Sequence, residues 1–136
     1  MNNTASTAPS QDPIRLPDVP VICANARQAS ILTTEGEIRV VDHETAKQII
    51  HKKAVLLCHA PYTRKQLGAK DILGFDILEL FAFVHPTKFC VPTPFGVSKA
   101  LEINLPNEFD EYPIALMECA KALLQDLRSD MWQAKA

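Results

Sequence analysis

Glycine and aromatic residues are scarce in this chain. Its 136 residues include only 4 glycines, and aromatic residues make up 7% of the total. The phosphate-binding sequence GxxxxGK[ST] does not occur, so nothing in this chain is suited to cradle the phosphates of ATP. No apolar run approaches the roughly 20 residues that a membrane-spanning helix requires. The sequence therefore excludes a P-loop motor within this chain and predicts no membrane contact.

An excess of charge of one sign is also missing. The chain has 14 Lys and Arg against 16 Asp and Glu, which gives a formal net charge of -2. No global positive field would attract nucleic acid or an anionic membrane, and any such contact must come from a local patch. The N-terminus, MNNTASTAPSQDP, lacks the basic start and apolar core of a signal peptide, which predicts a cytoplasmic location.

The 4 cysteines form no metal-binding motif. There is no CxxC sequence, and no Cys/His pair has zinc-finger spacing. Cys23, Cys58, Cys90 and Cys119 are far apart in the sequence and sit among apolar neighbours. We expect reduced thiols in the core, with a regulatory or metal role as the alternative.

The remaining composition is typical of one small globular domain. Hydrophobic residues make up 47% and charged residues 22% of the chain, values that are ordinary for a folded protein with a single core. Residues 1–20 are polar and proline-punctuated, which predicts a disordered or extended arm. Residues 21–127 would form the domain, and the polar residues 128–136 a frayed tail or a linker.

Three apolar segments have the length of β-strands. VICANA, at 21–26, predicts a short buried strand. Residues 31–41 predict a β-hairpin around Thr33-Thr34-Glu35-Gly36, because Gly36 can take the positive φ of a tight turn. AVLLC, at 54–58, is continuously apolar, as expected for a central strand covered on both faces.

Capping residues and apolar repeats predict the helices. Asp42 would cap a helix from 43 to about 52, and Thr93-Pro94 would begin a short one. The clearest helix repeats apolar residues at spacings of three and four, at Leu116, Cys119, Ala120, Leu123, Leu124 and Leu127. A strand, a hairpin, a helix, a strand and then helices predict an α/β fold with a mixed sheet, α+β being possible.

The stretch FDILELFAFVHP, at 75–86, raises a question about two carboxylates. Asp76 and Glu79 would either hold a metal or only begin a buried helix that His85-Pro86 ends. An acid in the first turn is favourable against the helix dipole. We favour the helix-starting interpretation, with a catalytic part for Asp76 as the alternative.

Four segments resemble, in order, the DnaQ-like exonucleases of the ribonuclease-H fold. They are AVLLCHAPYTRKQLG, FDILELFAFVHP, TPFGVSKALEINLP and EYPIALMECAKALL. The amino-acid sequences of the first two segments, together with TKFCVPTPFG, are similar to those of a narrower group. This group is the degenerate exonuclease-like N-terminal domains of alphaproteobacterial DinG-type DNA helicases. The resemblance implies a ribonuclease-H-like mixed sheet with a β-hairpin and flanking helices. It also implies a helicase motor in cis, which would bind the ATP and Mg²⁺, so no cofactor is expected in this chain.

The same resemblance implies that the family's metal site is lost. Two-metal nucleases need carboxylates that converge on two ions. The comparison places the family's first-strand Asp-x-Glu at SILTTEG, which has no aspartate, and its metal-binding aspartate at Arg64. Ala60 replaces the asparagine that follows His59, and Pro113 stands at the general-base histidine. Glu118 is the one acid left in register, so Glu118, Asp76 and His59 are only weak residual catalytic candidates and no metal site is expected.

Basic residues flank AVLLC on both sides. Lys52, Lys53, Arg64, Lys65 and Lys70 would contact phosphates if they shared a face, and would otherwise be a solvated surface. Three functions stay open. The first is a non-catalytic accessory domain of an ATP-dependent DNA helicase that aids contacts with single-stranded DNA or with the motor. The second is an active 3'-5' exonuclease with unusual metal ligands, and the third is an adaptor that binds a protein through KFCVPTPFG.

Overall fold

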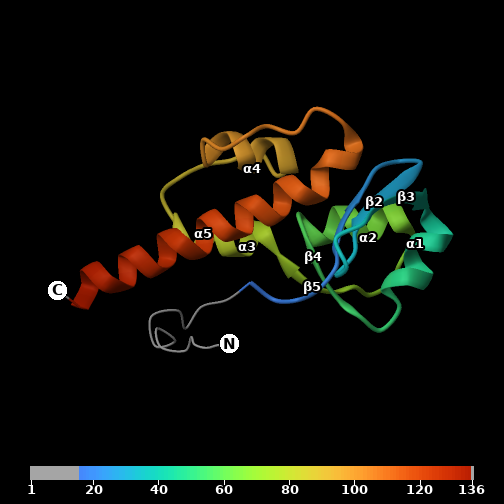
Figure 1. Cartoon of the computed structure of the whole chain (residues 1–136), viewed down its shortest axis with the longest axis horizontal. Coiled ribbons are helices and arrows are strands. Elements are labelled where there is room, and N and C mark those ends of the chain that lie inside the picture. Colours follow the sequence, from blue (N-terminus) through green and yellow to red (C-terminus); the bar gives the residue numbers. More distant parts are fainter. Residues whose placement is uncertain (1–15, 136) are drawn as a thin grey trace, which may run out of the picture.

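A computed structural model describes residues 16–135 of the chain, with side chains to residue 131 (Figure 1). Most of the arm predicted at 1–20 lies outside the described residues. The strands are β1 (Val21–Ala24), β2 (Gln28–Leu32), β3 (Ile38–Asp42), β4 (Ala54–Leu57) and β5 (Leu73–Asp76). The helices are α1 (His43–Ile50), α2 (Ala60–Leu67), α3 (Ile77–Val84), α4 (Pro94–Ala100), the 3-10 turn η3 (Phe109–Glu111) and α5 (Tyr112–Lys135).

The strands form one mixed sheet in the order β3-β2-β1-β4-β5. β1, β2 and β3 pair antiparallel, whereas β4 pairs parallel with both β1 and β5. The predicted α/β class with a hairpin and flanking helices is therefore confirmed. β4 has a neighbour on each side, as expected for AVLLC, but the middle strand of the sheet is β1.

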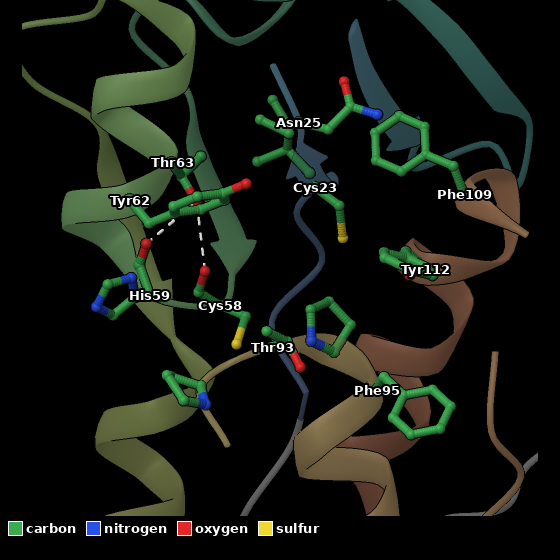
Figure 2. A pocket seen from close by; sticks show the side chains of 14 residues that line it. Cys23, Asn25, Cys58, His59, Tyr62, Thr63, Thr93, Phe95, Phe109 and Tyr112 are labelled. Carbon is green, nitrogen blue, oxygen red and sulfur yellow. Dashed lines mark hydrogen bonds between the residues drawn. The ribbon is translucent and has the colours of Figure 1, made fainter. Parts of the chain in front are cut away.

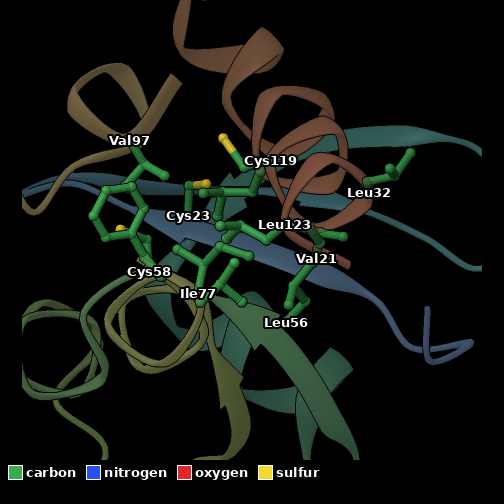
Figure 3. Packing of buried hydrophobic residues seen from close by; sticks show 13 residues of the cluster. Val21, Cys23, Leu32, Leu56, Cys58, Ile77, Val97, Cys119 and Leu123 are labelled. Carbon is green, nitrogen blue, oxygen red and sulfur yellow. The ribbon is translucent and has the colours of Figure 1, made fainter. Parts of the chain in front are cut away.

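Helices cover both faces of this sheet (Figure 1). Alternation along β4 sends Val55 and Leu57 to the cluster that includes Ala46 of α1 and Leu67 of α2. Leu56 points to the opposite cluster, which α3, α4 and α5 complete. Figure 3 shows that cluster, with Cys119 and Leu123 of α5 packed over the sheet and Val97 of α4 beside Cys58.

Local signals in the sequence explain several element ends. Gly36 has a φ of 93°, and the amide of Gly36 donates to the Thr33 carbonyl at 3.0 Å, which confirms the hairpin turn. The Asp42 carboxylate accepts a hydrogen bond from the Thr45 amide and so caps α1. That bond holds the pKa of Asp42 below its ordinary value. Thr93 caps α4 by accepting from the Gly96 amide at 2.9 Å.

Two elements differ from the sequence prediction. β5 was missed because its sequence, LGFD, is short, contains a glycine and is exposed along most of its length. α5 continues to Lys135, whereas the apolar repeat ends at Leu127 and a frayed tail was expected from residue 128. No helix among the described residues combines the length and the apolar character that crossing a membrane would need.

Candidate ligand-binding pocket

A cavity of about 600 Å³ opens where β1 and β4 end (Figure 2). The two strands are parallel neighbours, so their carboxyl ends meet at one edge of the sheet. Crevices at this edge of an α/β sheet are common ligand sites. The lining residues come from the ends of β1 and β4, the start of α2, the segment before α4, the start of α4, η3 and the start of α5. They are Ile22, Cys23, Ala24, Asn25, Cys58, His59, Tyr62, Thr63, Pro92, Thr93, Pro94, Phe95, Phe109 and Tyr112.

One wall of the pocket comes from the turn between β4 and α2. His59 lies just before α2 with φ 66° and ψ 77°, in the left-handed region that non-glycine residues rarely adopt. Its ring lies 6.1 Å from that of Tyr62, which is 43% exposed. The buried Thr63 hydroxyl reaches the carbonyl oxygens of Cys58 and His59 at 3.3 and 3.2 Å, which fixes the turn.

The opposite wall is built by aromatic rings from the last third of the chain. Phe109 and Tyr112 meet edge to face, with ring centroids 5.7 Å apart. Phe95, at the start of α4, is 41% exposed beside them. Figure 2 shows Tyr62 across the opening from Phe109 and Tyr112. The pocket therefore offers flat apolar surfaces on both of its sides.

Two thiols and one amide line the base of the pocket between these walls. Burial raises the pKa of Cys23 and of Cys58, with a smaller contribution from the Cys58 thiol at Cys23 and from the Asp76 carboxylate at Cys58. Both thiols stay protonated at neutral pH and serve as apolar lining groups. Asn25 is held at the end of β1, because its side-chain oxygen accepts from the amides of Arg27 and Gln28 at 2.9 and 2.7 Å.

Asp76 has a structural role next to the pocket. Its carboxylate accepts hydrogen bonds from the amides of His59, Ala60 and Leu78 at 2.9, 2.8 and 3.0 Å. The first backbone amides of a helix have no partner within the helix. Asp76 accepts from such amides at the starts of both α2 and α3. The helix-starting interpretation of Asp76 is confirmed, and the contact with the β4–α2 turn is an addition that the sequence did not indicate. Glu79 is exposed on α3, as expected.

The sequence segments compared with exonuclease motifs lie in several different elements of the structure. SILTTEG forms the end of β2 and the turn after it, whereas the first strand of the sheet is β1. Cys23 and Asn25, at the end of β1, are the residues of that strand that reach the pocket, and the sequence comparison missed them. Arg64 is not among the lining residues, while its neighbour Thr63 is. Glu118 also lies outside the lining and pairs with Lys121 at 3.4 Å on the exposed side of α5.

The five predicted basic residues fall into two groups. Arg64 and Lys65 lie on α2, with Lys65 one helical turn beyond Tyr62. Lys52, Lys53 and Lys70 line a second cavity, of about 740 Å³, where β4 and β5 begin. Arg64 and Lys65 line neither cavity and lie in the last turn of α2, which ends at Gly68, a residue of the second cavity's lining.

Neither a metal cluster nor a known relative identifies the pocket. Within residues 16–135, no three His, Cys, Asp or Glu side chains are grouped so that they could hold a metal ion. Comparison with protein-family models, curated proteins and solved structures finds no match for this chain. The pocket's own geometry and chemistry are therefore the basis for any functional assignment.

Proposed function

We propose that this chain is a non-catalytic, exonuclease-like accessory domain of an ATP-dependent DNA helicase, and that its pocket holds the bases of single-stranded DNA. The observation that carries the proposal is the pair of aromatic walls, with Tyr62 on one side and Phe109 and Tyr112 on the other. Proteins that bind single strands stack bases on aromatic rings, at about 1–3 kcal/mol per base. A cavity of about 600 Å³ is large enough for a base and its sugar.

Nearby charge also supports a nucleic-acid ligand. Lys65 is exposed on α2 and lies on the same face of the helix as Tyr62. Arg64 lies two residues beyond Tyr62 and faces another side of α2, so Lys65 is the cation that shares the helix face of Tyr62. Phosphates of a strand whose base enters the pocket would pass this part of α2, and neutralising them makes binding sensitive to salt.

The lining favours binding over cleavage. Two-metal cleavage requires carboxylates directed at the reacting phosphate. The described lining residues offer aromatic, thiol, hydroxyl, imidazole and amide groups, and none is an aspartate or glutamate. Glu118, the acid that the resemblance keeps in register, forms an ion pair with Lys121 on the exposed side of α5.

The helicase context rests on the resemblance of the sequence to DinG-type N-terminal domains. A reading frame that continues into a GxxxxGK[ST] sequence would support it, because that sequence defines the ATP site of such a motor. The motor domain would then be the partner in cis and would bring the ATP and Mg²⁺. A cytoplasmic location is part of the same proposal.

Binding to a labelled oligothymidine, followed by fluorescence anisotropy, tests the pocket. We expect weak binding that falls with salt, and we expect Tyr62→Ala and Phe109→Ala each to weaken it about tenfold, as loss of one stacked base implies. Phe89→Ala is the matched control, because Phe89 is 85% exposed and lies outside the pocket lining. Equal affinity in the pocket variants and the parent chain would remove the pocket from the proposal.

A nuclease assay separates binding from cleavage. The labelled strand is incubated with the purified domain and Mn²⁺, and the expected result is an intact strand. Shortening of the strand that disappears in Glu118→Ala would replace this proposal with the active exonuclease that the sequence left open.

A further inference from the structure

β5 forms one edge of the sheet and presents apolar side chains there. No other strand among residues 16–135 pairs with its outer side. Leu73 is 67% exposed and Phe75 is 50% exposed. They alternate with Gly74 and lie beside Ala54 and Leu56 of β4, so both are on the same face of the sheet. An exposed apolar edge strand is a ready template for another strand.

The opposite edge of the sheet is better protected. β3 carries the exposed charged residues Arg39 and Asp42 along its five residues. Charged side chains on an edge strand oppose pairing with another chain. β5 has no charged residue before Asp76, and the Asp76 carboxylate is already engaged by three backbone amides. The asymmetry between the edges points to a use for β5.

A basic cavity adjoins the start of β5. Leu73 lines the cavity of about 740 Å³ together with Lys52, Lys53 and Lys70. Lys47 and His51 complete its basic side, and Asp71 is the acid among its lining residues. Glu44, 2.7 Å from the Lys47 amine, balances one of these charges. The remaining excess of lysine would attract a negatively charged ligand.

We propose that β5 receives an extended segment of a partner protein by strand addition, and that acidic residues at one end of the segment contact the lysine cavity. Backbone hydrogen bonds along β5 would supply affinity, and side-chain contacts with Leu73 and Phe75 would select apolar residues at alternate positions. The lysines would fix the register by charge complementarity. The two features adjoin at Leu73, and a nucleic acid would use only the lysines. This site lies at the other end of β4 from the aromatic pocket and does not depend on it.

Two labelled peptides test the proposal on the whole chain. Each alternates valine and threonine, and a run of glutamates follows the alternation in one and precedes it in the other, because the added strand can run in either direction. A third peptide replaces the middle threonine with proline, which cannot donate to a strand ladder. We expect one of the first two to bind, the proline peptide to bind about tenfold more weakly, and the amide signals of Gly74 and Phe75 to shift in NMR spectra.

Paired variants locate the binding. Leu73→Thr with Phe75→Thr, and separately Lys52→Ser with Lys53→Ser and Lys70→Ser, should each weaken the peptide about tenfold or more. All five residues are exposed, so these variants should unfold like the parent chain. Val40→Thr is the matched control, since Val40 is an exposed apolar residue on the β3 edge.

Four results with the peptides would overturn the proposal, and self-association is a fifth. The four are failure of both peptides to bind, equal binding of the proline peptide, an equal loss in Val40→Thr, and displacement of the peptide by oligothymidine with dependence on the lysines alone. The last result would assign the cavity to nucleic acid. Self-association of the chain that disappears in Phe75→Thr would instead assign β5 to a second copy, and would also overturn it.

Discussion

At the scale of single residues, His59 combines backbone strain with a place in the pocket. Its left-handed conformation, φ 66°, disfavours any residue with a Cβ by about 1–2 kcal/mol. Strain of this kind persists where the surrounding structure fixes it, often at a functional site. Here the Asp76 carboxylate and the Thr63 hydroxyl hold the turn on both sides of the residue. The strained residue is also one that lines the pocket.

His59→Gly should therefore separate stability from binding. We expect it to raise the free energy of unfolding by about 1 kcal/mol, because glycine accepts this φ, and to weaken oligothymidine binding several-fold. Urea unfolding followed by circular dichroism and fluorescence anisotropy measure the two effects. Glu102→Gly is the matched control, since Glu102 has φ 58° and lies outside both cavities. Unchanged DNA affinity in His59→Gly would make the histidine a structural residue only.

Asp76→Asn should destabilise the fold by about 1–3 kcal/mol. The asparagine amide would place N–H donors where the aspartate accepts from Ala60, so at least one of three hydrogen bonds would be lost. Glu79→Gln, on the exposed side of the same helix, should change stability by less than about 0.5 kcal/mol. Equal unfolding midpoints for the two variants in urea would contradict the double-capping role of Asp76.

Residue types predicted roles that depend on neighbouring residues better than roles that depend on contacts between distant parts of the chain. Asp42 and Thr93 were correctly predicted as helix caps, and Asp76 as a residue that starts a helix, because capping depends on a few neighbouring positions. The approach of Cys23 to the pocket was missed, because it depends on β1 lying beside β4, a pairing between residues far apart in the chain. No short motif marks that contact in the sequence.

At the scale of elements, α4 contains a glycine, Gly96, that packs closely against the segment preceding the helix. A Cβ on Gly96 would lie 2.3 Å from the Val91 carbonyl oxygen and 2.6 Å from the Val91 Cβ. Backbone cannot move aside as a flexible side chain can, so α4 or the segment before it must shift. That segment carries Pro92 and Thr93, and α4 begins with Pro94; all three residues line the pocket.

Gly96→Ala should therefore cost about 2 kcal/mol or more in unfolding free energy and should also weaken oligothymidine binding. Urea unfolding and anisotropy on the same sample check both effects. Gly36→Ala is the control, because a Cβ there meets no atom within 4 Å and only the strain of φ 93° remains. We expect about 1 kcal/mol of destabilisation and no change in binding for the control. If Gly96→Ala keeps the parent chain's unfolding free energy and oligothymidine affinity, the segment before α4 can move aside and is not rigid.

Elements with a strong periodic or apolar signal were predicted, and those without it were not. The hairpin, β4 and α5 follow from apolar patterns over several residues. β5 has four residues, only one of them not exposed, so its strand state comes from pairing with β4 and leaves little trace in the sequence. The last part of α5 lacks the apolar repeat and is helical beyond the point where packing alone would predict it.

At the scale of the whole molecule, the sheet separates two chemically different ends. The aromatic pocket opens at the carboxyl ends of β1 and β4, and the lysine cavity opens where β4 and β5 begin. β4 has 4 residues, which at about 3.3 Å per residue span roughly 13 Å. At physiological salt the screening length is about 8 Å, so charges at one end contribute little at the other. The sequence placed all five basic residues around one strand but could not show that three of them, Lys52, Lys53 and Lys70, line one cavity while the other two lie on α2.

This separation predicts which basic residues affect DNA binding. At an ionic strength of about 0.15 M, Arg64→Ser with Lys65→Ser should weaken oligothymidine binding several-fold, whereas Lys52→Ser, Lys53→Ser and Lys70→Ser together should change it by less than about twofold. At about 0.01 M, where the screening length is about 30 Å, the triple variant should weaken binding as well, because its charges then act at a distance. Anisotropy titrations at both ionic strengths measure this. If the triple variant loses more affinity than the double variant at the higher ionic strength, the strand enters the lysine cavity and the aromatic pocket is not its main contact.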